Sequence, residues 1–214
     1  LKALVDQKNK PDYVIFSPFD GTAESSFALL NSEKISFVTL ERTLHEAEQA
    51  KVGLPQEHYS YWLGEVFHDN VQVGRLLTTT LIALANEKLP EKNYKFNAIG
   101  ISGSFSGESA DRTKGLLDSI TKRENIKVLQ IISAGWSREK TRSIFFQFNE
   151  RYSDIDIIWA ASDGMALGVM DAISSGHSKI NRESVVIGGV DWTPEAIRMI
   201  QKKQIDASVG GHFM

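Results

Sequence analysis

The chain has 214 residues, which is enough for one large domain or two small ones. Its composition, 42% hydrophobic and 24% charged, is typical of a globular protein, and a net charge of −3 gives no reason to expect nucleic acid or an anionic membrane as a partner. The sequence has no cysteine, which excludes disulfides, thiolate catalysis and cysteine-ligated metals, and no apolar run in it is long enough to span a bilayer.

Apolar runs and segments with helical spacing alternate along the chain. In chain order we expect strand 13–16, helix 23–30, strand 35–40, helix 70–86, strand 96–101, helix 109–121, strand 128–132, helix 138–148, strand 155–160, helix 163–174, strand 185–189, helix 194–203 and strand 205–209. Continuously apolar strands separated by helices indicate parallel sheets that are covered on both faces. The sequence therefore predicts a doubly wound α/β architecture, with too few repeats for a barrel of eight strands.

The polar stretch 43–68 interrupts this alternation. We expect it to be irregular and to form a crossover between two lobes. Asp69 and Asn70 follow it directly and are suited to cap the helix that opens the second lobe, because short polar side chains accept hydrogen bonds from free helix amides.

This interpretation gives a partial N-terminal lobe at 1–68, a C-terminal lobe at 69–211, and the start of a crossover back to the first lobe at 212–214. Residues 1–5 have the pattern of the inside of an amphipathic helix, without a capping residue. The last residues have the pattern of a strand that continues, so we expect a chain that is truncated at both ends.

Residues that follow the predicted strands are the candidates for a binding site, because ligands of open α/β sheets bind outside the carboxyl ends of the strands. Here these residues are polar, charged or aromatic. They are Ser17, Asp20, Glu41, Arg42, Ser102–Ser106, Arg112, Trp136, Ser162, Asp163, Asp191 and Trp192. Carboxylates and guanidinium groups bond pairs of hydroxyls, and an indole covers the C–H face of a ring, so the set favours a sugar.

The sequence offers little that indicates catalysis. The loop 102–107 lacks the Lys-Ser/Thr end of a P-loop and the glycine spacing of a dinucleotide site, and Phe105 stands where a nucleophile elbow has serine. We interpret it as a plain strand-to-helix turn. The five histidines are scattered without metal-ligand spacing. We therefore expect no metal, no cofactor and no enzymatic activity.

Several segments together resemble one family of proteins. They are Val38-Thr39-Leu40-Glu41-Arg42, His68-Asp69-Asn70, Ser109-Ala110-Asp111-Arg112-Thr113-Lys114-Gly115, Ala161-Ser162-Asp163-Gly164-Met165-Ala166-Leu167-Gly168 and Gly188-Gly189-Val190-Asp191-Trp192-Thr193-Pro194-Glu195-Ala196. In order and context they resemble the periplasmic sugar-binding proteins of the ribose/galactose type, the receptors of ABC importers. The resemblance implies the type I periplasmic binding protein fold, in which two lobes close on a sugar.

The resemblance also implies which residues contact the ligand. They are Glu41 and Arg42 as an acid–arginine pair, Arg112 from a helix, Trp136 beside the sugar ring, Ser162 in place of an asparagine, and Asp191. Ser17 and Asp20 are further candidates, and His212 is a candidate to replace a polar residue near the final crossover. Glu41 is longer than the aspartate usual in the family and Ser162 is shorter than asparagine, so the identity of the sugar stays open.

Each of these residues also has a structural alternative. Arg42 and Arg112 can form surface ion pairs, Trp136 can pack between lobes, and Ser162 and Asp191 can cap helices. The implied partners are a membrane ABC permease or a sensor protein, and the implied state is a monomer in the periplasm after removal of a signal peptide. Two alternatives share the fold: the effector-binding domain of a LacI-type regulator and the extracellular sensor domain of a signalling receptor.

Overall fold

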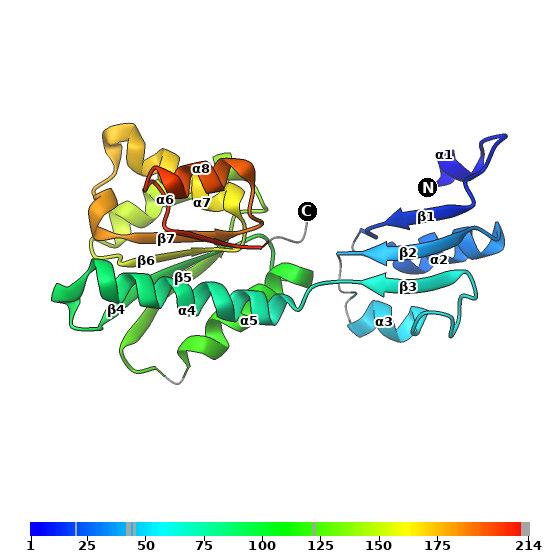
Figure 1. The fold of residues 1–214 in the computed structure, drawn as a ribbon, viewed down its shortest axis with the longest axis horizontal. Coiled ribbons are helices and arrows are strands. Elements are labelled where there is room, and N and C mark those ends of the chain that lie inside the picture. The colour runs from blue at the N-terminus through cyan, green and yellow to red at the C-terminus, as the bar shows by residue number, and fades with distance from the viewer. Residues whose placement is uncertain (20, 42–43, 45, 122, 211–214) are drawn as a thin grey trace. The chain divides into compact units, whose positions relative to one another are not determined.

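The computed structural model divides into two compact units, Leu1–His68 and Asp69–Met214, each with its own parallel sheet and hydrophobic core (Figure 1). The structure describes residues 1–19, 21–41, 44, 46–121 and 123–210. Strands and helices alternate in both units, so the predicted α/β class is confirmed. Among the described residues, no helix is both long enough and apolar enough to cross a membrane.

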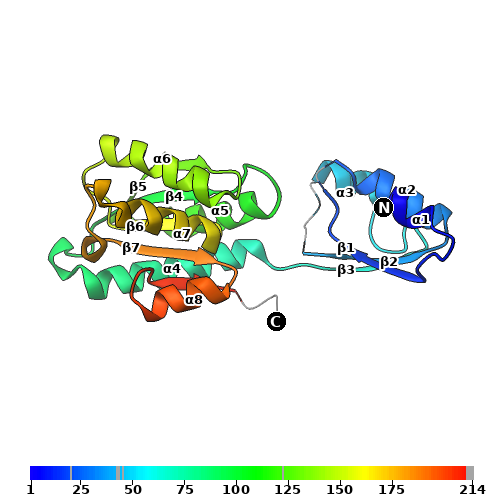
Figure 2. The same ribbon diagram turned by 90° about the horizontal axis from the view of Figure 1, so that it is seen from above.

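The first unit has a three-stranded sheet in the order β1-β2-β3. Its elements are α1 (Lys2–Val5), β1 (Tyr13–Phe16), α2 (Ala23–Ser32), β2 (Ser36–Leu40), α3 (Glu46–Val52) and β3 (Trp62–Val66). The helices lie on one face of the sheet (Figure 2), where Phe27 packs between Phe37 and Trp62 with ring centroids 5.0 and 4.6 Å away. The opposite face exposes Tyr13 and Ile15, so the expected cover on both faces is absent from the described part of this unit.

The expectation of an irregular stretch at 43–68 is wrong, because α3 and β3 lie within it. The helix is polar and buries only Val52. In β3 only Trp62 is fully buried, and Gly64 and Glu65 interrupt the apolar pattern that marks the other strands. The sequence signal of both elements is weak for this reason, and pairing with β2 stabilises the strand.

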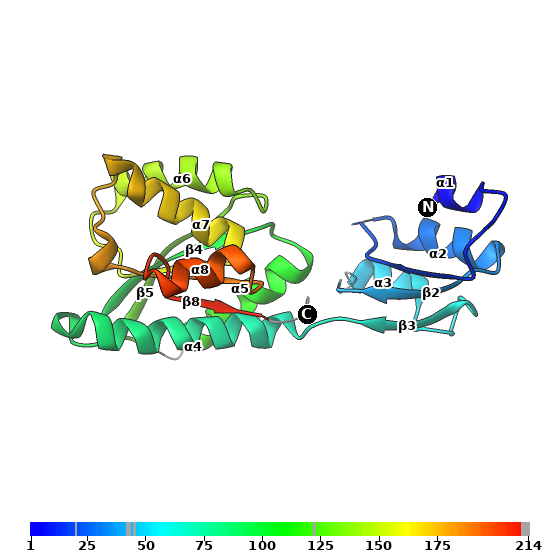
Figure 3. The ribbon, with the colours of Figure 1, turned by 45° about the horizontal axis from the view of Figure 1, so that its top comes forward.

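The second unit has a five-stranded parallel sheet in the order β5-β4-β6-β7-β8. Its elements are α4 (Asn70–Lys88), β4 (Phe96–Ser102), α5 (Gly107–Ile120), β5 (Ile126–Ser133), α6 (Arg138–Arg151), β6 (Ile157–Ala160), α7 (Asp163–Ala172), β7 (Val186–Val190), α8 (Pro194–Gln201) and β8 (Ala207–Val209), with short helical turns at Pro90–Lys92, Ile173–His177 and Arg182–Ser184. Helices α4 and α5 cover one face, and α6, α7 and α8 cover the other (Figures 1 and 3). Strands β6 and β7 are buried along their whole length, as expected for strands with helices on both sides.

Helices α4 and α5 cross in backbone contact through two glycines. A Cβ atom added to Gly74 would lie 2.0 Å from the carbonyl oxygen of Arg112, and one added to Gly115 would lie 2.1 Å from the carbonyl oxygen of Val71. No side chain fits at either position without moving a helix. The crossing therefore brings the first turn of α4 close to Arg112, and this contact is the basis of the site described next.

Candidate functional site

Arg112 projects from α5 toward the carboxyl ends of the strands in the second unit and is only 6% exposed. Its Nε atom donates to Oδ1 of Asn70 at 2.9 Å, and Nη1 donates to the carbonyl oxygen of Ala161 at 2.7 Å. Nη1 also lies 3.4 Å from Oδ1 of Asp191. A buried guanidinium needs such partners. Its second terminal nitrogen, Nη2, makes no hydrogen bond within the described ranges of the chain and is available to a ligand.

Asn70 is the site residue that the sequence reasoning assigned only to helix capping. It is the first residue of α4, and it is 3% exposed. The cap itself is Asp69, whose carboxylate accepts a hydrogen bond from the backbone N–H of Gln72 at 2.9 Å. The Asn70 amide oxygen is therefore available to hold Arg112. Only its place in the family-like segment His68-Asp69-Asn70 gave a signal, because the contact joins residues far apart in the sequence.

Asp191 follows β7 in a turn with unusual backbone geometry. Its φ is 123° and that of Trp192 is 55°, both in the region that favours glycine. The Asp191 N–H donates to the carbonyl oxygen of Val209 at 2.8 Å, which ties the turn to β8. Burial raises the pKa of Asp191 to about 6, although the nearby positive charge of Arg112 opposes the shift.

Trp136 follows β5 and lies beside Arg112. Gly135 and Trp136 both have φ values of 61°, so the chain turns sharply and brings the indole against Gly103, where an added Cβ would lie 2.2 Å from the ring. The guanidinium carbon of Arg112 is 5.8 Å from the ring centroid, a distance typical of a cation–π contact. The indole is still 39% exposed and can contact a ligand.

Ser162 and Asp163 begin α7, close to the same strand ends. The Ser162 hydroxyl accepts from the backbone N–H of Met165 at 3.3 Å, which is the capping role predicted as its structural alternative. Its contact with a ligand stays a prediction, and its side chain is 7% exposed. The Asp163 carboxylate is fully buried, and its pKa is raised by that burial while hydrogen bonds from Ser208 and Thr193 oppose the shift.

The remaining predicted residues belong to the first unit or lie outside the described residues. In the first unit, Ser17 is exposed directly after β1, and Glu41 is half-buried after β2 with its N–H bonded to the carbonyl oxygen of Val66 at 2.7 Å. Arg42, Asp20 and His212 lie outside the described residues, as do 212–214 with their predicted crossover.

The loop 102–107 is a strand-to-helix turn, as predicted from its sequence. The buried hydroxyl of Ser109 accepts from the backbone N–H groups of Gly103 and Ser104 at 2.8 and 3.0 Å. These amides are therefore already satisfied and do not form a phosphate cradle. Within the part of the chain that the structure describes, no three histidine, aspartate or glutamate side chains converge as a metal site requires.

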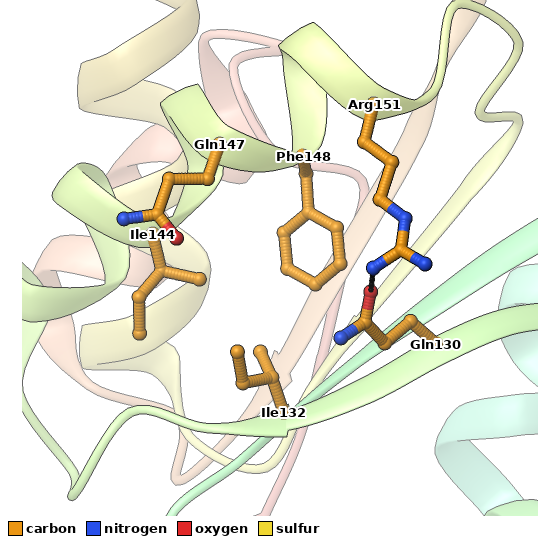
Figure 4. A pocket seen from close by; sticks show the side chains of 6 residues that line it. All are labelled: Gln130, Ile132, Ile144, Gln147, Phe148 and Arg151. Carbon is orange, nitrogen blue, oxygen red and sulfur yellow. Dashed lines mark hydrogen bonds between the residues drawn. The ribbon is translucent and has the colours of Figure 1, made fainter.

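The second unit thus brings together a guanidinium, a carboxylate and an indole. Arg112 offers donors, Asp191 offers acceptors, and Trp136 offers a flat apolar surface, which together suit a small molecule with hydroxyls on a ring. A separate hollow between β5 and α6 contains a hydrogen bond of 3.4 Å between Arg151 and Gln130 (Figure 4). Its volume of about 170 Å³ is below the range of about 300–1,000 Å³ for ligand pockets, so it is a poorer candidate.

Several known proteins share sequence or fold with this chain. A sequence model described as "Periplasmic binding protein domain" matches residues 1–212. The galactofuranose-binding protein YtfQ of Escherichia coli is 24% identical over 79% of this chain and 54% of its own length, and the D-allose-binding periplasmic protein of the same organism is 31% identical over 66% and 43%. The chain thus spans about half the length of these two relatives.

A solved structure shows the same fold. The periplasmic solute-binding protein of an ABC transporter from Actinobacillus succinogenes, with bound D-allose, superposes with a TM-score of 0.79 and 23% identity, over 95% of this chain and 66% of that chain. A periplasmic sugar-binding protein from Pseudomonas fluorescens also has a TM-score of 0.79, with 20% identity over 99% and 60%. At this identity the likeness concerns the fold, which is that predicted from the sequence.

Proposed function

This chain belongs to the periplasmic binding protein domain family. We propose that it is part of a sugar-binding receptor. This receptor captures a sugar or sugar-like polyol without converting it and delivers it to an ABC importer. The proposal includes a membrane permease as partner, a periplasmic location and a monomeric state. The named ligands of its relatives, galactofuranose and D-allose, are polyhydroxylated rings of the class that we propose for this protein.

The observation that carries the proposal is the state of Arg112. Its guanidinium is buried and held on two edges by Asn70 and the Ala161 carbonyl. Nη1 also lies 3.4 Å from the carboxylate of Asp191, and Nη2 makes no hydrogen bond to the described residues. A sugar hydroxyl can accept from the guanidinium and donate to the carboxylate at the same time, since it has both a proton and lone pairs. The exposed indole of Trp136 lies next to them to cover the C–H face of the ring.

In the described part of this cluster, we assign the polar groups to holding the sugar and not to converting it. Arg112 is a donor only, and the carboxylate of Asp191 is engaged with it. The arrangement is therefore one for binding. Ser17, Asp20, Glu41, Arg42, Ser162 and His212 remain proposed contacts of the same ligand.

Isothermal titration of the full-length protein against D-allose, D-ribose, L-arabinose and methyl β-D-galactofuranoside tests the proposal. We expect saturable binding of at least one sugar. Arg112→Lys keeps the charge but loses the planar fork, so it should weaken that binding by about 10- to 100-fold, the effect of about 1.5–3 kcal/mol for a lost charged hydrogen bond.

Arg75→Lys is the matched control. Arg75 lies on α4 and forms a half-exposed ion pair with Asp118 on α5, and neither residue is among the proposed ligand contacts. Exposed pairs of this kind contribute about 0–1 kcal/mol, so its sugar affinity should stay within a few-fold of the wild type. Absence of binding to every sugar of the panel, or equal effects of the two substitutions, would contradict the proposal.

A further inference from the structure

The turn that carries Asp191 and Trp192 is in a conformation that its residues do not favour by themselves. Both have positive φ, 123° and 55°, and neither is glycine. Such backbone conformations persist only where the surroundings hold them. The groups that hold this turn therefore decide where the Asp191 carboxylate and the Trp192 indole lie.

The carboxylate of Asp163 binds the chain just after the turn. Its Oδ2 atom accepts from the backbone N–H of Thr193 at 2.8 Å and from the Thr193 hydroxyl at 3.1 Å. Thr193 in turn caps α8, because its hydroxyl oxygen accepts from the N–H of Ala196 at 3.2 Å. Asp163 thus fixes the point at which the turn enters α8.

The same carboxylate holds the neighbouring strand through Ser208. The Ser208 hydroxyl donates to Oδ1 of Asp163 at 2.7 Å, and its oxygen accepts from the backbone N–H of Trp192 at 3.1 Å. The Trp192 indole N–H also donates to the Ser208 carbonyl oxygen, at 2.8 Å. Ser208 therefore links the Asp163 carboxylate to the backbone of Trp192, one of the two strained residues.

The Asp163 carboxylate is closely packed. A Cβ atom added to Gly189, in strand β7 just before the Asp191–Trp192 turn, would lie 2.7 Å from Oδ1 of Asp163, so only glycine leaves room for the carboxylate there. Asp163 is fully buried, and the hydrogen bonds from Thr193 and Ser208 compensate the loss of water. Among the described residues, the Asp163 carboxylate makes its hydrogen bonds to Thr193 and Ser208 and none to Trp136 or Arg112.

We propose that Asp163 and Ser208 are positioning residues of the sugar site, which hold the Asp191–Trp192 turn in its strained form and thereby set the geometry of ligand binding without touching the ligand. This inference rests on the proposed function for its ligand, but the hold on the turn is a property of the unliganded protein. The two can therefore be tested separately.

The first measurement uses the indole N–H signals of the four tryptophans in a ¹H–¹⁵N correlation spectrum of the full-length protein without sugar. Trp192→Phe assigns the signal of Trp192. Ser208→Ala should move this signal, because the turn loses its hydroxyl anchor, while the signal of the core residue Trp159 stays in place. A loss of structure throughout the unit would move both signals.

The second measurement is the affinity for whichever of D-allose, D-ribose and methyl β-D-galactofuranoside binds the wild-type protein. Ser208→Ala and Asp163→Asn should each weaken it about tenfold, since each removes a hydrogen bond to a charged group. Ser208→Thr keeps the hydroxyl and should restore both the affinity and the Trp192 signal. Ser143→Ala, on the exposed side of α6, should change neither.

The outcomes separate the two proposals. If Ser208→Ala and Asp163→Asn both fold, bind sugar like the wild type and leave the Trp192 signal unchanged, the positioning role is wrong and the receptor function stands. Failure of Ser208→Thr to restore the signal would also overturn the role. If the wild type binds no sugar, the proposed receptor function is wrong. The Trp192 signal in Ser208→Ala then tests by itself whether Ser208 and Asp163 hold the turn.

Discussion

From the close crossing of α4 and α5 we predict that a single added methyl group at Gly115 weakens sugar binding. In Gly115→Ala the added carbon would lie 2.1 Å from the Val71 carbonyl oxygen and 2.8 Å from the Arg75 nitrogen, distances shorter than real side chains show. The obstacles are backbone atoms, which cannot rotate away. The two helices must therefore separate by about 1 Å to restore ordinary contact.

The magnitude has two parts. Overpacking costs about 1–3 kcal/mol, and the better helix propensity of alanine returns about 1 kcal/mol, so we expect a net loss of about 0–2 kcal/mol in the free energy of unfolding. Arg112 lies one helical turn before Gly115, and its bond to Asn70 is 2.9 Å long. A separation of about 1 Å takes it beyond hydrogen-bond distance, and the loss of a charged bond corresponds to about 10-fold or more in affinity.

Gly164→Ala in α7 is the matched control, because an added Cβ there would meet only the Ser162 hydroxyl at 3.9 Å. This variant should be as stable as the wild type or more stable by about 0.4–1 kcal/mol. Urea unfolding and calorimetric titration with the bound sugar measure both quantities. If Gly115→Ala unfolds at the same urea concentration as Gly164→Ala and binds sugar equally well, the glycine crossing does not position Arg112.

Three further predictions concern single groups of the site. Gly103→Ala would place a Cβ 2.2 Å from the Trp136 ring and should lower sugar affinity and shift tryptophan fluorescence with little change in Tm. Asn70→Ala leaves Nε of Arg112 unpaired, and should reduce affinity by about 10-fold or more in titration calorimetry. Sugar affinity should fall as the pH drops through about 6, the pKa of Asp191, because the protonated carboxyl accepts hydroxyl protons poorly; Asp191→Asn should remove this dependence in titrations at several pH values.

The raised pKa of Asp191 changes the stability of the fold with pH in the opposite direction to sugar affinity. The folded protein holds the Asp191 proton more tightly than the unfolded chain, whose carboxyl has the ordinary value of 3.8. Its contribution to the stability of the sugar-free protein is therefore complete below that value and is lost as the pH rises through about 6. Acid thus favours the sugar-free fold at this residue while it disfavours binding.

The sequence predicts those elements whose burial is continuous. Strands such as Val186–Val190 are apolar throughout because helices cover both faces, and they were located to within two residues. Strand Trp62–Val66 was missed because only Trp62 is fully buried in it, and because Gly64 and Glu65 interrupt its apolar pattern. Helix Glu46–Val52 was missed because only its last residue is buried, so it has no apolar stripe.

The site shows a similar limit. Trp136 and Asp191 were predicted as site residues because each follows a strand, and the parallel sheet brings strand ends together. Arg112 lies within α5, and the family resemblance also pointed to it. Asn70 was not assigned to the site, since its contact with Arg112 depends on how closely two helices cross. Nothing in the local pattern around Gly74 or Gly115 distinguishes a glycine at a helix crossing from any other glycine within a helix.

For the proposed sugar site, we infer that preorganisation is the reason for burying Arg112 where a flexible surface side chain would also reach a ligand. A free arginine loses up to about 2 kcal/mol of rotamer entropy when it binds, and this loss is subtracted from ligand affinity. Arg112 is already fixed by Asn70 and the Ala161 carbonyl, so folding of the second unit bears that cost. The same argument applies to the strained turn at Asp191. The surrounding structure already fixes its carboxylate, so ligand binding does not have to supply the entropy cost of ordering it.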